Sequence, residues 1–305
     1  MRDLSGLEGT ELVAFCDVIE EKAEKAADNY NGHSYTDFNQ MLTEEDLDAV
    51  YISIPPFAHG APERAVIKAG LAMFVEKPVH MDTQDAREIA QLVDEASIIT
   101  ATGYQERYLD IVDKTKELLA DRRVGFFMGY WMGGMPGRWW REKAKSGGQV
   151  HEQTTHEIDL ARYLFGEATR VYAVDRTGLL PDADYDIEEA SAVSMQFENG
   201  VFGVMFSACF IQAGMRRSGL DIFCQDGSIE YRLRKSLTLS TAEGEHLWEA
   251  KNPYTLEMDR TFIEAVRSGD GSKIRSPYAD AVKSAELSIA ANQSLLTGQA
   301  IHLTK

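Results

Sequence analysis

A chain of 305 residues has room for about two domains, and 44% hydrophobic with 26% charged residues is the composition of a soluble globular protein. The net charge of −18 argues against nucleic acid or an anionic membrane as a partner, because both attract positive surfaces. The longest uncharged apolar run, residues 201–211, is too short for a membrane span, which needs about 20 residues.

The cysteines and the first residues indicate a cytoplasmic protein. Cys16, Cys209 and Cys224 lie far apart in apolar stretches and form no CxxC pair. We therefore expect buried, reduced thiols rather than a disulfide framework or a zinc cluster. Residues 1–9 lack the apolar core of a signal peptide.

Strands and helices alternate through the first hundred residues. Short apolar runs predict strands, and stretches rich in Ala, Glu and Lys predict helices. The predicted strands are residues 11–16, 48–54, 71–75 and 97–103, and the predicted helices are residues 20–30, 58–69 and 82–95. This alternation predicts right-handed crossovers and a parallel, doubly wound sheet of Rossmann type, which we assign to residues 1–103.

The rhythm changes after Gly103. Predicted helices are residues 109–120, 153–165, 256–268 and 277–296, with a strand at 124–131 and a loop rich in Gly, Trp and Arg at 133–148. Residues 169–249 predict successive antiparallel strands, with Asn199-Gly200 and Asp226-Gly227 as hairpin turns. Residues 104–305 are thus predicted to form an α+β domain on a mostly antiparallel sheet, and the fold class of the whole chain is α/β.

Asp17 ends the first predicted strand. In a dinucleotide-binding unit, an acid at the end of the second strand receives the adenosine ribose, about 20 residues after a glycine-rich phosphate turn. Counting back from Asp17 passes Met1, and Gly6 and Gly9 do not form GxGxxG. We therefore expect that the first strand and its phosphate turn are missing, by truncation or by a real loss, and that this chain binds dinucleotides weakly.

Glu76, Lys77 and Pro78 follow the predicted strand at residues 71–75. Ligands bind at the carboxyl ends of the strands of an open α/β sheet, so Lys77 is a candidate catalytic group. A solvated Glu-Lys pair at a strand end is the alternative, and these residues alone leave both open.

Seven stretches together resemble the Gfo/Idh/MocA oxidoreductases: residues 11–17, 54–59, 76–78, 103–107, 147–159, 276–282 and 295–302. The resemblance implies a Rossmann domain followed by a domain with a large open sheet, which often forms dimers or tetramers, so we expect a homo-oligomer. It also implies oxidation of a hydroxyl of a sugar, cyclitol or related polyol with NAD(P), or reduction of the ketone.

Oxidation of an alcohol requires a base for the hydroxyl proton and a donor for the developing alkoxide. The resemblance assigns these roles to His156 and Lys77, and a histidine has a suitable pKa of about 6.5. Glu152 lies four residues before His156 and would share its helical face, where the family usually has aspartate. A surface helical pair is the alternative; a zinc site is not expected, because His151 and His156 are five residues apart rather than four.

The resemblance also suggests residues for the cofactor and the substrate. NAD is favoured over NADP, because Asp17 with Glu20 and Glu21 nearby disfavours a 2′-phosphate. The expected cofactor contacts are Asp17, Ile54, Pro55, His59, Glu76 and Lys77, although Asp17 and His59 could instead cap helices. The expected substrate contacts are Lys77, Arg107, Trp140, Arg141, Glu152 and Asp159, with Trp139 as a neighbour; Asp159 could instead brace its helix, and the tryptophan loop could be packed core.

Two other functions remain open from the sequence. One is a redox-neutral enzyme that uses tightly held NAD for transient oxidation, as glycosidase-like relatives of this fold do. The other is a non-catalytic ligand-binding or regulatory protein. The expected loss of the phosphate turn favours this second alternative. The joint presence of Lys77, Glu152 and His156 speaks against it.

Overall fold

The computed structural model describes residues 1–181 and 184–303, and its first part is a Rossmann-like arrangement of parallel strands. β1 (Ala14–Cys16) pairs with β2 (His33–Tyr35), and β3 (Ala49–Ile52), β4 (Ala72–Val75) and β5 (Thr100–Thr102) form a three-stranded parallel sheet. The helices between them are α2 (Glu20–Tyr30), α3 (Phe38–Glu44), α4 (Ala61–Lys68) and α5 (Thr83–Ala96). All of β4 is buried, whereas most of β3 is only half-buried, since β3 has a strand neighbour on one side alone among the described residues.

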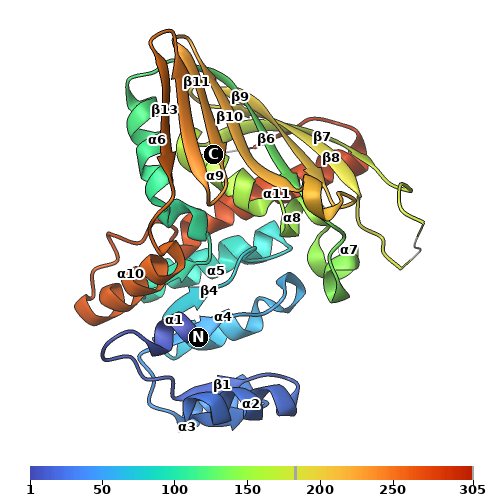
Figure 1. Ribbon diagram of the computed structural model, residues 1–305. Helices are drawn as coiled ribbons and strands as arrows, with labels where there is room; N and C mark the ends of the chain where they lie inside the picture. The colour runs from blue at the N-terminus through green and yellow to red at the C-terminus, as the bar shows by residue number, and fades with distance from the viewer. Residues whose placement is uncertain (182–183, 304–305) are drawn as a thin grey trace.

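The second part is a nine-stranded sheet in the order β13-β12-β11-β10-β6-β9-β8-β7-β14 (Figure 1). Its strands are β6 (Val124–Met132), β7 (Ala168–Arg176), β8 (Ala190–Phe197), β9 (Phe202–Ala208), β10 (Arg217–Cys224), β11 (Gly227–Arg232), β12 (Ser236–Thr241), β13 (Gly244–Glu249) and β14 (Ile301–His302). Every neighbouring pair is antiparallel except β6 and β9. The α/β fold class with a large, mostly antiparallel second sheet is therefore confirmed.

Among the described residues, helices share an apolar core with one face of the nine-stranded sheet. α6 (Asp110–Ala120), α8 (Gln149–Glu152), α9 (Thr155–Phe165) and part of α11 (Tyr278–Thr297) contribute to a single apolar core with that face. Successive side chains of a strand point to opposite faces. The opposite face therefore presents exposed apolar side chains: Phe126, Met128, Tyr172, Val174, Phe202 and Phe206.

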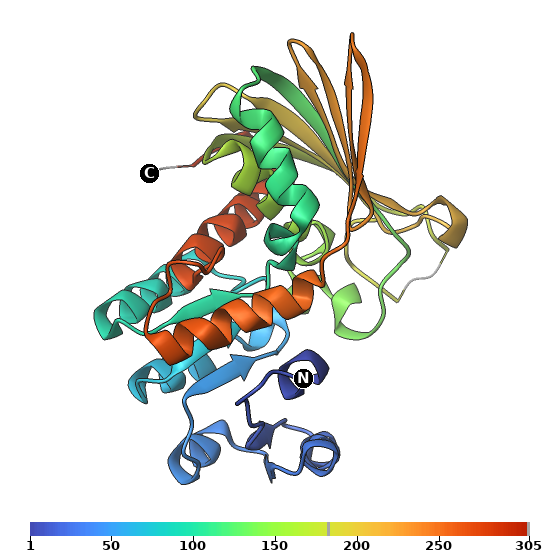
Figure 2. The same ribbon diagram turned by 60° about the vertical axis from the view of Figure 1, so that its left-hand side comes forward.

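The C-terminal helices join the two parts of the molecule (Figure 2). α10 (Tyr254–Ser268) covers one face of the three-stranded sheet, where the ring of Phe262 meets Tyr51 and Phe74 edge-on at 5.4 and 5.7 Å. The first half of α11 packs with α5 on the other face, and its second half packs on β7. The edge of the parallel sheet is thereby fixed relative to α8 and α9.

Several local expectations differ from the structure. β2 and α3 were not predicted, because β2 has the polar sequence His-Ser-Tyr and is largely exposed. The predicted helix at residues 153–165 is observed as α9, whereas α8 before it was not predicted; the Thr154 hydroxyl, between the two helices, lies 2.6 Å from that of Ser207 on β9. The second hairpin turns at residues 225–226, one residue early, since Cys224 already pairs with Gly227.

The three cysteines are free, but they are not all buried as expected. Cys209 is buried and Cys224 half-buried, whereas Cys16 is exposed because it ends a short strand in a two-stranded sheet. None of the described helices is both long and apolar enough to cross a membrane.

Candidate active site

Candidate ligand-binding residues follow the strands of the three-stranded sheet at one edge. Ile54 and Pro55 follow β3, Glu76 and Lys77 follow β4, and Gly103 follows β5. Strands in a parallel sheet end at the same edge, so these residues gather where α/β proteins bind ligands. Gly103 permits a close approach, because a Cβ atom there would lie 2.5 Å from the carboxylate of Glu76.

Lys77 and Glu152 form an ion pair between β4 and α8. The Lys77 Nζ donates to Oε1 and to the backbone carbonyl of Glu152, both at 2.9 Å. The side chains are 14% and 6% exposed, so solvent screens this pair less than a surface pair. Burial raises the pKa of the Glu152 carboxyl, and the Lys77 ammonium opposes that shift. Oε2 of Glu152 is buried and has no partner among the described residues.

His156 lies in the first turn of α9. Glu152 is the last residue of the preceding helix, α8. Burial, with Lys77 and Arg234 as neighbouring cations, holds its pKa well below the usual value of 6.5. The ring is therefore neutral at neutral pH and can accept a proton. Its Nδ1 is buried and lies 3.5 Å from Oε2 of Glu106, and the side chain keeps 17% exposure.

Glu106 and Arg234 adjoin this group and were not predicted. Glu106 lies in the short helix η2 (Gln105–Tyr108), and its Oε1 accepts two hydrogen bonds from the guanidinium of Arg234. Arg234, between β11 and β12, lies 128 residues away in sequence, so no local pattern could have paired them. The available signal was an acid three residues after the end of the predicted strand at residues 97–103.

Arg107 and Asp159 do not fit the expected substrate role. The Arg107 guanidinium is 2% exposed; its Nε donates to Asp159 at 2.8 Å and its Nη1 donates to Asp280 at 2.6 Å. Asp159 is 1% exposed and also accepts from Ser284. The polar atoms of both residues make contacts inside the protein that join η2, α9 and α11. These contacts favour the alternative in which Asp159 braces its helix, and they offer no support for the expected substrate role of Arg107.

His59 is fully buried rather than lining an open surface. Its Nδ1 contacts Glu63, and Oε2 of Glu63 accepts the Gly60 N–H at 2.6 Å, at the start of α4. His59 Nε2 has no partner among the described residues. The contact of His59 Nδ1 with Glu63 fits the alternative in which His59 supports the start of a helix. Glu63 itself caps α4 by accepting the Gly60 N–H.

Asp17 has the contacts of a helix-start residue. Its Oδ1 accepts the Ile19 N–H at 2.9 Å, and its Oδ2 lies 3.8 Å from Lys22. The carboxylate is 36% exposed, so it can still accept hydrogen bonds from ribose hydroxyls. The residues present therefore fit the ribose and nicotinamide ends of a dinucleotide, with Asp17 at one end and Glu76 and Lys77 at the other.

The tryptophan loop borders the same region. Trp139 and Trp140 lie in η3 (Arg138–Arg141), and Trp139 meets Phe57 from the first part of the chain, with ring centroids 6.5 Å apart. Trp140 is 40% exposed and free to meet a ligand. Arg141 is partly engaged, because its Nε donates to the carbonyl of Pro136 at 2.5 Å.

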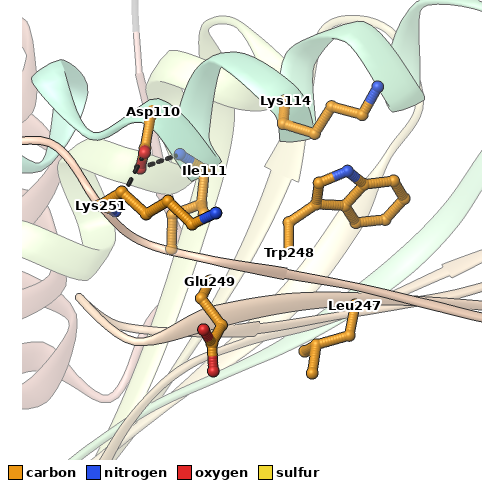
Figure 3. Close-up of a pocket in the computed structure, with 7 residues that line it drawn as sticks. All are labelled: Asp110, Ile111, Lys114, Leu247, Trp248, Glu249 and Lys251. Carbon is orange, nitrogen blue, oxygen red and sulfur yellow. Dashed lines mark hydrogen bonds between the residues drawn. The ribbon is translucent and has the colours of Figure 1, made fainter.

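A separate crevice of about 440 Å³ lies between α6 and β13 (Figure 3). In it the Lys114 ammonium lies over the Trp248 ring, 5.2 Å from its centroid, and Asp110 accepts the backbone N–H groups of Ile111 and Lys251. None of Lys77, Glu152 and His156 lines this crevice. It is therefore distinct from the candidate active site.

Comparisons with known proteins identify the family of the chain. A family model described as an oxidoreductase family with an NAD-binding Rossmann fold matches residues 2–104. The model of the GFO/IDH/MocA C-terminal domain matches residues 121–230. The first match defines the class, an oxidoreductase with an NAD-binding Rossmann fold. Both together show that the chain belongs to the Gfo/Idh/MocA family.

Individual relatives are distant but span most of the chain. The chain is 25% identical to 1,5-anhydro-D-fructose reductase of Ensifer adhaerens, covering 97% of this chain and 92% of that protein. It is 24% identical to scyllo-inositol 2-dehydrogenase (NAD(+)) of Bacillus subtilis, covering 98% and 91%. Levoglucosan dehydrogenase, solved with NADH and levoglucosan, shares the fold with a TM-score of 0.85 at 20% identity, covering 96% and 90%.

Proposed function

We propose that this oxidoreductase oxidises a hydroxyl of a sugar, cyclitol or related polyol with NAD, or reduces the corresponding ketone. The observation that carries the proposal is the Lys77–Glu152 ion pair beside a neutral His156, at the carboxyl edge of the parallel strands. The named activities of the two curated relatives, a reductase and a dehydrogenase of sugar-like and inositol substrates, support this substrate class.

Each residue has a role that follows from its surroundings. NAD, when bound, supplies the acceptor for the hydride that leaves the carbinol carbon. His156 takes the hydroxyl proton, because its lowered pKa keeps the imidazole neutral. Lys77 stabilises the negative charge that develops on the oxygen. Glu152 holds the Lys77 ammonium in place through its carboxylate and its backbone carbonyl.

Cofactor and substrate contacts complete the proposal. We assign Asp17 to the adenosine ribose, and Ile54, Pro55, His59 and Glu76 to the nicotinamide side, with NAD preferred over NADP. Trp140 and Arg141 border the substrate, since aromatic faces stack on sugar rings and a guanidinium binds hydroxyls. Residues 1–103 would form the dinucleotide-binding unit, and residues 104–305 would form the substrate unit. Helix α10 of the substrate unit packs on the three-stranded sheet of the dinucleotide-binding unit.

The test is formation of NADH when the chain is mixed with NAD and a panel of inositols, anhydrosugars and aldoses. Net NADH with one class of polyol supports a dehydrogenase. Cleavage or rearrangement of a glycoside without net NADH would instead support the redox-neutral alternative. Absence of both, with NAD shown to bind by fluorescence, would contradict the proposal.

A second copy of the chain is the partner we propose for the open sheet face. Phe126 lies between Phe202 and Phe223 of the neighbouring strands, with ring centroids 5.8 and 4.7 Å away. An exposed row of apolar side chains on a sheet is typical of a protein interface. A cytoplasmic location fits the three free thiols.

A further inference from the structure

Two buried carboxylates lie near His156, and only one of them contacts it. Oε2 of Glu106 lies 3.5 Å from His156 Nδ1, whereas Glu157, the next residue on α9, accepts a hydrogen bond at 2.6 Å from Ser218 instead. Glu106 Oε2 and His156 Nδ1 are both buried and have no hydrogen-bond partner among the described residues. A separation of 3.5 Å is longer than a good hydrogen bond, but such bonds often shorten when a substrate binds.

Arg234 fixes the carboxylate from the other side. Its Nε donates to Oε1 of Glu106 at 3.0 Å, and its terminal Nη2 donates to the same oxygen. Arg234 has a positive φ of 56°, which is unusual for a residue with a side chain. The turn between β11 and β12 therefore has a left-handed backbone conformation at Arg234. Glu106 is 1% exposed. Its Oε1 is bonded to Arg234, and its Oε2 faces His156.

We propose that Glu106 is the positioning residue of His156, and that Arg234 holds the Glu106 carboxylate in place. The Glu106 carboxylate accepts the Nδ1–H of the imidazole, which leaves the lone pair on Nε2 to accept the substrate proton. This proposal rests on the proposed function, in which His156 is the base, and it adds the group that selects its tautomer. A histidine base needs such a selection, because the wrong tautomer presents a proton where the lone pair is required.

The other charged groups around His156 are less suited than Glu106 to accept the Nδ1–H. Lys77, after β4, and Arg234 are cations and disfavour the imidazolium. Glu152 on α8 is paired with Lys77. Burial raises the pKa of Glu157 to about 8, so this neighbour is protonated and uncharged at neutral pH. Burial also raises the pKa of Glu106, but the Arg234 guanidinium opposes that shift.

The tautomer can be measured without any turnover. Nitrogen NMR of the full chain, with ring nitrogens labelled, reports which histidine nitrogen carries the proton, and His156→Gln identifies the signal by removing it. We expect His156 at neutral pH with Nδ1 protonated and Nε2 free. A protonated Nε2 in the wild-type chain would overturn the proposal, whether or not a substrate has been found.

Variants separate the charge of Glu106 from its hydrogen bond. Glu106→Gln retains an acceptor but no charge, so the tautomer should persist while the acid limb of the kcat profile moves to lower pH by about 1 unit. Glu106→Leu removes both, and we expect a mixture of tautomers and a loss in kcat on the order of 10–100-fold with little change in KM, as for other partners that orient a functional histidine.

Glu157→Gln is the matched control, because it changes an adjacent buried carboxyl that is already neutral and does not contact His156. We expect its acid limb and its tautomer to match those of the wild type. An equal displacement of the limb in Glu157→Gln and Glu106→Gln, or an unmoved limb in Glu106→Gln with normal thermal stability, would overturn the proposal. If no polyol yields NADH, the proposed function fails while the tautomer measurement still decides this inference.

Discussion

Lys77 Nζ lies 2.9 Å from both the carboxylate and the backbone carbonyl of Glu152, so a side chain that follows β4 is held by the end of α8. The pair joins residues 75 positions apart and spans the junction of the parallel sheet and the second part of the chain. A lysine fixed in this way presents a cation of defined position rather than a mobile surface charge.

Lys77→Met should reduce kcat by about 10²–10³-fold, because the developing alkoxide loses its cation. It should also destabilise the fold by roughly 3–5 kcal/mol if Glu152 stays ionised, because a buried charge is left unpaired. Steady-state kinetics and urea unfolding measure the two effects. Lys77→Met/Glu152→Leu is the control for stability: recovery of most of the free energy of unfolding without recovery of kcat is expected, and recovery of both would contradict the role of Lys77.

Glu152→Asp tests the departure from the family's usual acid. Shortening the side chain by one methylene loosens the contact with Lys77 but keeps its charge, so we expect a modest loss of kcat, about 10-fold or less. Glu152→Gln removes the charge that opposes the desolvation of Lys77, and its loss should be larger. Equal activity of Glu152→Gln and the wild type would show that Lys77 needs no carboxylate partner.

Arg107→Met should destabilise the protein by about 3–5 kcal/mol, because Asp159 is left as an unpaired buried charge. The KM for substrate should stay close to the wild-type value, since the guanidinium makes its contacts with Asp159, Asp280 and the carbonyl of Arg275. Urea unfolding and kinetics at low temperature check both. A large rise in KM with unchanged stability would restore Arg107 as a substrate contact.

Glu157 should make the stability of the fold depend on pH. Its pKa is raised from 4.5 to about 8 in the folded protein, so the folded state holds a proton that the unfolded chain releases. The stabilisation that Glu157 contributes to the folded state is fully present below about pH 4.5. It is lost as pH rises toward 8, and the free energy of unfolding falls by several kcal/mol at most. The free energy of unfolding of Glu157→Gln minus that of the wild type should therefore increase with pH over this window. A constant difference would contradict a neutral Glu157.

Phe126→Asp should disrupt the assembly that we propose to form through the open sheet face. A charge in the middle of the aromatic row formed with Phe202 and Phe223 removes apolar area and adds a desolvation cost. Sedimentation should show a shift from oligomer to monomer. Leu296→Asp is the control, since Leu296 is 80% exposed on α11, which packs on the opposite face of the sheet, and this variant should sediment like the wild type. A monomeric wild type would refute the interface.

Local patterns in the sequence predicted β4 and α9, two of the elements that carry the candidate site. The apolar run before Glu76 predicts β4, and the end of β4 predicts the position of Lys77, because burial of a parallel strand requires a continuous apolar segment. The four-residue spacing placed Glu152 and His156 on one helical face, whereas Glu152 ends α8, where it pairs with Lys77, and His156 lies in the first turn of α9.

Contacts between distant segments could not be predicted in this way. Arg107 follows a strand end, as a ligand-binding arginine would, yet Asp159 and Asp280 reach it from 52 and 173 residues away. The pairing of Glu106 with Arg234 likewise depends on how η2 meets the nine-stranded sheet. Sequence alone shows which side chains stand at the edge of a sheet, whereas tertiary packing decides which of them remain free to meet a ligand.

The central claim is that His156 is the base of an alcohol oxidation assisted by Lys77. The most direct measurement is the pH dependence of kcat for NADH formation from an accepted polyol, for the wild type and for His156→Gln, with folding verified by circular dichroism. Because the pKa of His156 is held well below 6.5, the wild-type rate should be sustained through neutral pH and fall only at more acidic pH. His156→Gln should lose this acid limb and about 10²–10⁴-fold in rate. A folded His156→Gln that retains the wild-type rate and the same acid limb would contradict the claim.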